Sequence, residues 1–482
     1  MGRVHPRVDL GSMAVQGEPY QGHRETTVKL APGTSVEQIQ SGFALRSGTR
    51  HVALDPSWGR YLDALEELAV RDLSEAAWAE RFVEAGGDEG ADRLRGLLPV
   101  LESAGLLSRT LRFEGQPVAK LAPVAAPRDA PERAVQGRDY HLGRFGLLRV
   151  EEGDLVLSSP LSTYRLMVID PRVLLAVWRL ASRANADQLE DLAPGVGRAL
   201  LELLCRGRLV EEASPSSPQT SPPWEFHELL FHTASRLGGR DVRIGATYPG
   251  AESGPAPPGI PPTASDVPVI PLPVPPAGSK PSVPFEQVLW HRRSITSSGR
   301  RPVRLIELAE LLRLSCRLTN EGRPAGSNAY PVYQRNYPSG GGIHCLDVYP
   351  VVMACEGLLP GVYRYDPRGH ALELRAPGPG IAEGLVRAHG VPLTGSTSPP
   401  IMLLMTARME RVAWKYSAIS YSLIQKEVGA LFQTLYLVAT YLGLAPTAWG
   451  SGDSHAFSRA TGIPFLEQPT IGEFLVGTRP ET

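Results

Sequence analysis

A lysine and a tyrosine, Lys415 and Tyr416, stand next to each other immediately before a long run with helical periodicity. Both side chains can exchange protons, and a lysine acts as a base near neutral pH when burial lowers its pKa. The pair follows the apolar segment Ile401 to Thr406, which has the composition of a buried strand, so it would lie at a strand end that can face a ligand. On these residues alone, a solvated surface dipeptide is the simpler interpretation.

Arginines and a serine form a second group with possible chemistry. Arg292, Arg293 and Ser294 stand together at the start of the C-terminal part of the chain. Guanidinium groups bind phosphate oxygens in a fork, and a helix N-terminus adds amide donors. Arg479 follows the last apolar segment and can return to the same anion. A solvated basic turn and a solvated terminal arginine are the alternatives.

Two glycine-rich loops complete the candidate site. Ser339, Gly340 and Gly341 directly precede an apolar strand, and glycines there let the backbone press against a flat ligand and point amides at it. Gly450 and Ser451 lie in a second such loop after the long helix. Neither loop is a Walker motif or a dinucleotide fingerprint, because the lysine is missing and the first loop precedes its strand. Plain connecting turns are the alternatives.

The length, the net charge and the apolar runs of the chain exclude several classes of protein. The chain has 482 residues with 49 basic and 50 acidic side chains, a net charge of −1. This size predicts about three domains, and the balanced charge argues against a nucleic-acid binder. Apolar runs are too short for a membrane helix, and the N-terminus lacks the apolar region of a secretory signal. We therefore expect a cytoplasmic protein without membrane or nucleic-acid partners.

Cysteine usage supports the same compartment. The four cysteines are Cys205, Cys316, Cys345 and Cys355, and none forms a CxxC pair. Their spacing matches neither a disulfide scaffold nor a zinc site. We expect four reduced, structural thiols and no metal site.

The N-terminal half predicts two small winged-helix-like modules, residues 1–125 and 130–250. In the first, apolar periodicity predicts helices around 58–69, 76–85 and 91–104, followed by a β-wing at 106–113. The second repeats this order, with strands near 145–150, 154–158 and 165–169, helices at 172–183, 186–192 and 196–205, and a closing strand at 207–211. A helix with a tail is expected over 224–249. Two unrelated α/β pieces are the alternative.

A proline-rich segment, 251–284, separates these modules from the C-terminal part, 285–482. Polyproline is stiff and extended, so the segment is a semi-rigid spacer or a strap over the surface. Beyond it, strands expected at 346–354, 361–365, 401–406 and 474–477 alternate with helices at 305–314 and 421–442. The predicted fold class of this part is an α+β sandwich.

Taken in chain order, these motifs resemble the flavin-dependent nitroreductase superfamily over residues 285–482. More narrowly, the chain is similar to SagB/ThcOx-type dehydrogenases, the azoline oxidases of thiazole- and oxazole-modified peptide pathways. The segment 224–247 looks like the lead-in of those proteins. The N-terminal modules are similar, more weakly, to the PqqD-like peptide-binding winged helices.

The resemblance implies roles for individual residues. Arg292, Arg293 and Ser294 match the motif for the FMN phosphate and ribityl chain, and Arg479 lies where a C-terminal phosphate ligand is expected. The two glycine loops, Ser339-Gly340-Gly341 and Gly450-Ser451, match those that contact the flavin. Lys415 and Tyr416 match the pair regarded as catalytic. The chain departs from the pattern where many members have an arginine (Thr296 here) and a Leu-Tyr-Pro segment (residues 343–345 here).

The resemblance also implies an activity and partners. The expected reaction is FMN-dependent dehydrogenation of thiazolines or oxazolines to azoles in a precursor peptide, by a homodimer that works with a cyclodehydratase complex. An NAD(P)H-dependent nitro- or quinone reductase is the first alternative, since it would share the fold and FMN. A peptide-binding scaffold with a degenerate flavin domain is the second.

Overall fold

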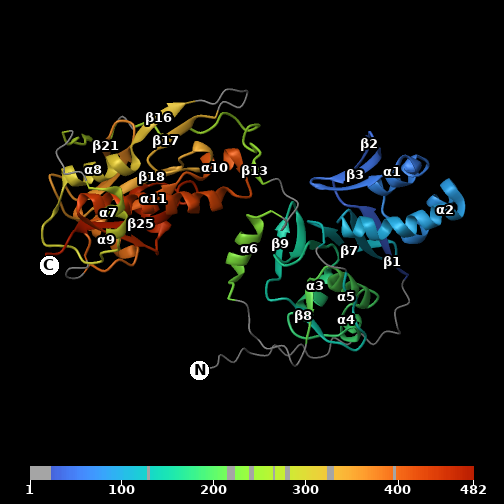
Figure 1. Ribbon diagram of the computed structural model, residues 1–482. Helices are drawn as coiled ribbons and strands as arrows, with labels where there is room; N and C mark the ends of the chain where they lie inside the picture. The colour runs from blue at the N-terminus through green and yellow to red at the C-terminus, as the bar shows by residue number, and fades with distance from the viewer. Residues whose placement is uncertain are drawn as a thin grey trace. The chain divides into compact units, whose positions relative to one another are not determined.

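The computed structural model describes residues 23–127, 131–213, 223–237, 244–263, 266–276, 283–322, 330–393 and 398–481. The chain divides into two compact units, Met1–Val242 and Arg243–Thr482, which we call unit 1 and unit 2. Figure 1 shows the course of the chain through both. Within the described residues, no helix is long and apolar enough to span a bilayer.

One antiparallel sheet runs through unit 1 in the order β5-β1-β6-β7-β11-β10-β9. Its strands are β1 (Arg24–Leu30), β5 (Leu73–Ser74), β6 (Leu107–Phe113), β7 (Gln116–Pro123), β9 (Leu147–Glu151), β10 (Asp154–Ser158) and β11 (Tyr164–Val168). β7 pairs with β11, with Leu121 opposite Leu166. The segments proposed as two modules therefore share a continuous sheet, although each has its own hydrophobic cluster.

The helices of unit 1 fall into two groups. The first hydrophobic cluster contains residues of the 3₁₀ turn η1 (Pro56–Tyr61), α1 (Leu62–Val70) and α2 (Glu75–Ser103). The second contains residues of α3 (Pro171–Arg179), α4 (Ala186–Leu192) and α5 (Gly197–Arg206). Ser74 caps α2 through a hydrogen bond from the Ala77 amide, and Gly87, at φ +61°, interrupts the helical backbone. Two of the expected helices thus form one interrupted element.

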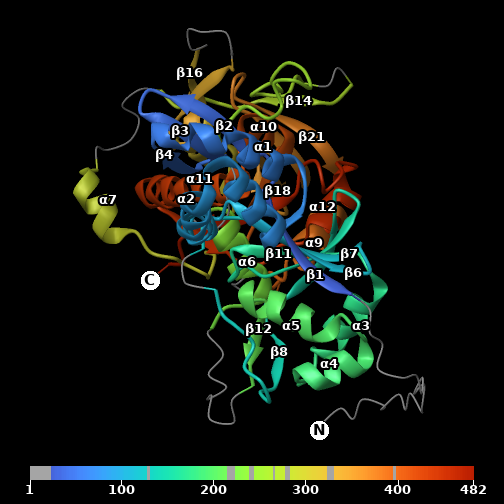
Figure 2. The same ribbon diagram turned by 90° about the vertical axis from the view of Figure 1, so that its right-hand side faces the viewer.

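Some elements of unit 1 were not predicted from the sequence, and one was predicted to be longer than it is. A small sheet of β2 (Ser35–Ile39), β3 (Gly42–Ser47) and β4 (Arg50–Leu54) was not expected, and Figure 2 shows it beside α1. The expected helix over 224–249 is only α6 (Phe226–Ala234). β8 (Tyr140–Leu142) pairs with β12 (Val210–Glu212), which closes the second half of the unit.

Unit 2 is built on a second antiparallel sheet, ordered β14-β21-β20-β18-β22-β25-β24. Its strands are β14 (Val269–Pro271), β18 (Leu346–Val352), β20 (Gly361–Asp366), β21 (Ala371–Pro377), β22 (Ile401–Ala407), β24 (Leu444–Trp449) and β25 (Thr470–Thr478). Three short pairs flank it: β13 (Gly245–Ala246) with β23 (Tyr416–Ser417), β15 (Val303–Arg304) with β19 (Cys355–Glu356), and β16 (Leu318–Gly322) with β17 (Val332–Arg335).

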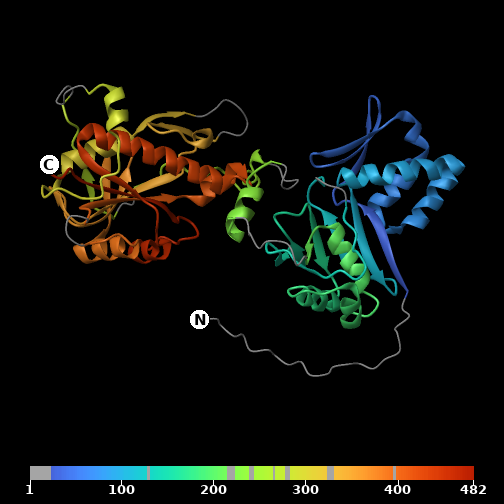
Figure 3. The same ribbon diagram turned by 60° about the horizontal axis from the view of Figure 1, so that its bottom comes forward.

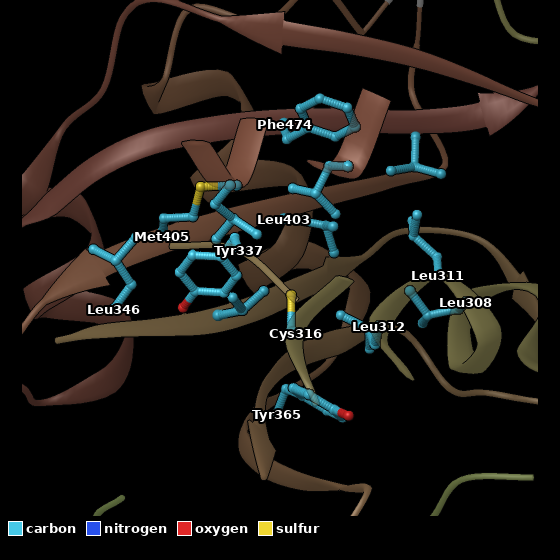
Figure 4. Packing of buried hydrophobic residues seen from close by; sticks show 14 of the residues in the cluster. Leu308, Leu311, Leu312, Cys316, Tyr337, Leu346, Tyr365, Leu403, Met405 and Phe474 are labelled. Carbon is cyan, nitrogen blue, oxygen red and sulfur yellow. The ribbon is translucent and has the colours of Figure 1, made fainter. Parts of the chain in front are cut away.

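Helices cover both faces of this sheet, as Figure 3 shows. α8 (Leu305–Cys316) and α11 (Ser420–Leu442) contribute to one core, and α9 (Pro379–Ala388) and α12 (Ser454–Thr461) to the other. Every residue of β22 is buried, because alternate side chains enter the two cores. Figure 4 shows the first core, to which leucines of α8 and Leu403 and Met405 of β22 all belong. The predicted α+β class is confirmed.

The proline-rich segment is part of unit 2. β14 pairs with β21, with Ile270 opposite Leu372. The Arg364 guanidinium donates to the Pro261 and Pro262 carbonyls and forms a buried ion pair with Glu373. We call residues 244–263 the strap, because they are hydrogen-bonded to unit 2 along their length. Of the two interpretations of the sequence, the described residues fit a strap.

The Arg364–Glu373 pair yields a stability prediction. Arg364→Met leaves the fully buried Glu373 carboxylate without its main partner and frees two strap carbonyls, so we expect a loss of about 3 kcal/mol in the free energy of unfolding. Arg368→Met, which breaks an exposed pair with Glu321, should cost less than about 1 kcal/mol. Urea unfolding of both variants checks this, and equal losses would contradict it.

Candidate functional site

Lys415 and Tyr416 lie where α10 (Met409–Lys415) ends and β23 begins. Only 8% of Lys415 is exposed, so the pair is not the solvated dipeptide that the sequence also allowed. The Lys415 Nζ donates to the Gly341 carbonyl at 3.3 Å and lies 5.0 Å from the ring centre of Tyr330. The ring of Tyr416 is 5.4 Å from the same nitrogen.

The first glycine loop meets this pair across 74 residues of sequence. It forms a short 3₁₀ turn, η2 (Gly340–Gly342), in which Gly341 has φ +62°. A β-carbon at Gly341 would lie 2.7 Å from the Lys415 Nζ and closer still to the Tyr416 hydroxyl. A larger residue would have to adopt this rarely populated backbone conformation and displace the ends of both side chains. The structure therefore brings Gly341, Lys415 and Tyr416 into one group, which we call the Lys–Tyr group.

Ser339 points into the protein. Its hydroxyl donates to the Glu427 carboxylate at 2.6 Å and accepts from the His344 amide at 2.9 Å. Glu427 is buried on α11, and burial raises its pKa. Ser339 thus fixes the shape of the glycine loop from below. Sequence reasoning missed Glu427, although an acid among the core positions Ile424 and Val428 of α11 was a usable signal.

Burial governs the electrostatics of the Lys–Tyr group. The pKa of Lys415 is lowered, first by desolvation and then by the positive charge of Arg411. Burial raises the pKa of Tyr416, so its hydroxyl stays protonated. The group therefore combines an amine that readily becomes neutral with a phenol that can donate a hydrogen bond. These are the properties of a proton acceptor and a polarising donor.

The arginine group forms at the other end of α11. The Ser294 hydroxyl lies 2.7 Å from that of Tyr436, and the Arg292 guanidinium lies over the Tyr436 ring at 5.3 Å. Arg479 donates weakly to the Leu444 carbonyl, and Arg293 is exposed. Among the described residues, no carboxylate pairs with Arg292, Arg293 or Arg479. These cations are available to an anion.

The second glycine loop faces a different neighbour. Gly450 is exposed, and the Ser451 hydroxyl donates to the His389 carbonyl at 3.0 Å, next to the Trp449 indole. Below it, burial raises the pKa of Glu473 to about 7. The His389 Nε2 lies 3.8 Å from that carboxylate and has no hydrogen-bond partner among the described residues. Sequence reasoning missed both residues.

The predicted residues thus form separate groups along one helix. Glu427, beneath the first glycine loop, and Tyr436, in the arginine group, are nine residues apart on α11. At 1.5 Å per residue, this places the two groups about 13 Å apart along the helix axis. Arginines without carboxylate partners among the described residues, two glycine loops and a proton-exchanging pair suit a long, flat, phosphorylated cofactor.

Two protein-family models match this chain. Residues 290–478 match the nitroreductase family model, so the match spans most of unit 2 and both groups. Unit 2 is a nitroreductase-like domain. Residues 140–241 match the model of the cyanobactin oxidase ThcOx, on the second half of unit 1. The predicted resemblance to ThcOx-type members of this superfamily is confirmed, and the nitroreductase domain is an oxidoreductase domain.

Individual relatives are distant. A nitroreductase-like protein of Methanocaldococcus jannaschii is 28% identical over 169 residues, which are 35% of this chain and 79% of that protein. The Escherichia coli microcin synthetase McbBCD complex with truncated pro-MccB17 is 19% identical over 43% of this chain and 77% of its own, with a TM-score of 0.33. A Bacteroides fragilis nitroreductase with bound FMN is 12% identical over 41% and 89%, with a TM-score of 0.26.

The nitroreductase domain yields a prediction at Gly341. Gly341→Ala forces a β-carbon against Lys415 and Tyr416 at a positive φ, so we expect a loss of about 2 kcal/mol in the free energy of unfolding. Gly429→Ala on α11, where a β-carbon meets open space, should be neutral or stabilise by about 1 kcal/mol. Urea unfolding compares them, and a Gly341→Ala protein as stable as the parent would contradict the contact.

Proposed function

We propose that this protein is an FMN-dependent dehydrogenase that oxidises thiazolines or oxazolines in a ribosomally made peptide to thiazoles or oxazoles. The observation that carries the proposal is the Lys–Tyr group, a buried amine and a partly buried phenol against the first glycine loop of an oxidoreductase domain. A reductase that takes hydride from NAD(P)H does not need such a pair. The ThcOx match over residues 140–241 supports the same peptide chemistry.

FMN fits the residues that are present. Arg292, Arg293 and Arg479 have no carboxylate partner within the described part of the chain, and they would hold its phosphate. Ser294 would contact the ribityl chain. The backbone of Gly340 and Gly341 would contact the ring, and Gly450 and Ser451 would form the second loop. Ser339 would act indirectly, because its hydroxyl is bonded to Glu427. When bound, FMN accepts the two electrons of the oxidation as a hydride.

The chain's own residues handle the proton. Converting an azoline to an azole removes a proton from one ring carbon and a hydride from its neighbour. The neutral Lys415 amine would accept the proton at Nζ, and the Tyr416 hydroxyl would donate a hydrogen bond to the ring nitrogen. Desolvation lowers the pKa of Lys415 and raises that of Tyr416, and both shifts favour the protonation states that these roles require.

A homodimer is part of this proposal. α7 (Phe285–His291) precedes the arginine group directly and exposes large apolar side chains. Phe285 is 66% and Trp290 73% exposed, which is unusual for neighbouring aromatic residues of one helix. A second copy that covers α7 would complete the surroundings of Arg292. A cyclodehydratase complex that supplies the azoline peptide is the other proposed partner.

The catalytic role is tested with an azoline-containing peptide. Lys415→Ala and Tyr416→Phe should each lower kcat about 100-fold or more, while flavin content and melting temperature stay close to the parent values. Lys426→Ala, an exposed lysine on α11, is the matched control and should be fully active. The readout is the loss of two hydrogens per ring by mass spectrometry. Consumption of NADPH without change in the peptide would identify a reductase instead.

Flavin binding is tested separately. Arg292→Ala removes a charge-assisted contact to the phosphate, so we expect roughly tenfold or greater weakening of FMN binding, measured by flavin fluorescence after dialysis. Arg459→Ala, which removes an exposed arginine from α12, should bind FMN as the parent does. A parent protein that neither purifies with flavin nor binds added FMN would support the peptide-binding scaffold. Full FMN retention in Arg292→Ala would remove Arg292 from the site.

A further inference from the structure

One arginine of unit 2, Arg411, is wholly buried. It lies on α10, one helical turn before Lys415. Its Nε donates to the Ile343 carbonyl at 2.8 Å, one Nη to that of Pro331 at 3.1 Å, and the other to that of Pro257. All its nitrogens are therefore hydrogen-bonded, although every acceptor is a neutral carbonyl.

These three carbonyls belong to three different segments of unit 2, and Arg411 bonds to all three. Ile343 follows the first glycine loop, Pro331 precedes β17, and Pro257 lies in the strap. The strap also accepts from Trp414 through Gly254, and its Tyr248 amide donates to the Lys415 carbonyl at 3.0 Å. The guanidinium thus connects the glycine loop and the strap to the helix that ends at Lys415.

The charge of Arg411 has no carboxylate partner among the described residues. Its neighbour Arg408 uses the same strap, through Pro258 and Gly259, but forms an ion pair with Asp347 at 3.2 Å. Besides Arg408, the titratable groups that act on Arg411 include Tyr330, Tyr333 and Cys345, and His344 lies nearby. The pKa of His344 is lowered to about 3, chiefly by burial, and burial raises the pKa of Cys345 and Tyr330.

Lys415 is the group that senses this charge. Residues four apart lie on the same side of a helix, so the two cations are neighbours on α10. The groups that face the Lys415 Nζ from other elements are the Gly341 carbonyl and the rings of Tyr330 and Tyr416. None of these carries a negative charge. A buried like charge favours the neutral amine, because protonation would place two unpaired cations together.

We propose that Arg411 is a positioning residue for the Lys–Tyr group: it fixes the glycine loop and the strap against α10, and its buried charge keeps the Lys415 amine in the proton-accepting form. This inference rests on the proposed function of Lys415 as a base. It adds that the base is prepared by a residue that does not touch the reacting atoms.

Competitive labelling tests this inference without any turnover. The chain has five lysines, so acetylation of Lys415 by trace acetic anhydride can be followed by mass spectrometry against the exposed Lys426. In the parent protein, the ratio of Lys415 to Lys426 labelling should rise as the pH is lowered from 10 to 7. In Arg411→Met, Lys415 labelling at pH 8 should be about tenfold slower, because more of the amine is protonated.

Two variants separate charge from position. Arg411→Lys keeps the charge but not the three-way contact, so it should lower the melting temperature and preserve the labelling ratio. Arg408→Met loosens the same strap and should also leave the ratio unchanged. A folded Arg411→Met protein with the parent ratio overturns the inference. If that variant does not fold, a ratio in the parent that is independent of pH overturns it. If the parent protein shows the expected labelling but does not oxidise an azoline peptide, the proposed function is rejected and the inference about Arg411 is not.

Discussion

The close approach of Gly341 to Lys415 and Tyr416 is the constraint on which the candidate site depends. A backbone without a β-carbon lets a loop and a helix end touch, and the Lys415 amine uses the loop carbonyl as its acceptor. The loop must then be held from its other side, which Ser339 does through Glu427. Burial follows from this contact, and the altered proton affinities of the lysine and the tyrosine follow from burial.

Helix α11 gives the site its length. One helix carries Glu427 beneath the glycine loop and Tyr436 beside Ser294, so their spacing is set by a rigid element rather than by loops. The helix also packs on the sheet through Ile424 and Leu431, which are fully buried. Core packing and site geometry are therefore properties of the same element. Glu427 is tolerated among apolar neighbours because its carboxylate accepts a hydrogen bond from Ser339 of the glycine loop.

The strap gives the proline-rich segment a structural role. Prolines lack the amide donor but keep the carbonyl acceptor, so an extended proline-rich chain presents mainly acceptors. Arg408, which precedes α10, and Arg411 and Trp414 within α10 donate hydrogen bonds to these carbonyls. The composition of the strap and the basic character of α10 are thus complementary. These hydrogen bonds fix the end of α10, which carries the Lys–Tyr group.

The sequence by itself determined the local features. Periodicity placed α4, α8 and α11 within a few residues, and the almost wholly apolar composition of residues 401–406 predicted the buried strand β22. Motif order identified the nitroreductase-like part of the chain. These features are readable because they depend on neighbouring residues, and because backbone conformation and apolar spacing are local properties.

Only the tertiary structure decided which distant residues meet. It joined the two N-terminal modules in one sheet, placed the strap on unit 2, and turned Ser339 toward Glu427 instead of outward. It also put Arg411 in contact with carbonyls 68 to 154 residues away. No local pattern encodes such contacts, because any buried donor can satisfy any acceptor that packing brings within reach.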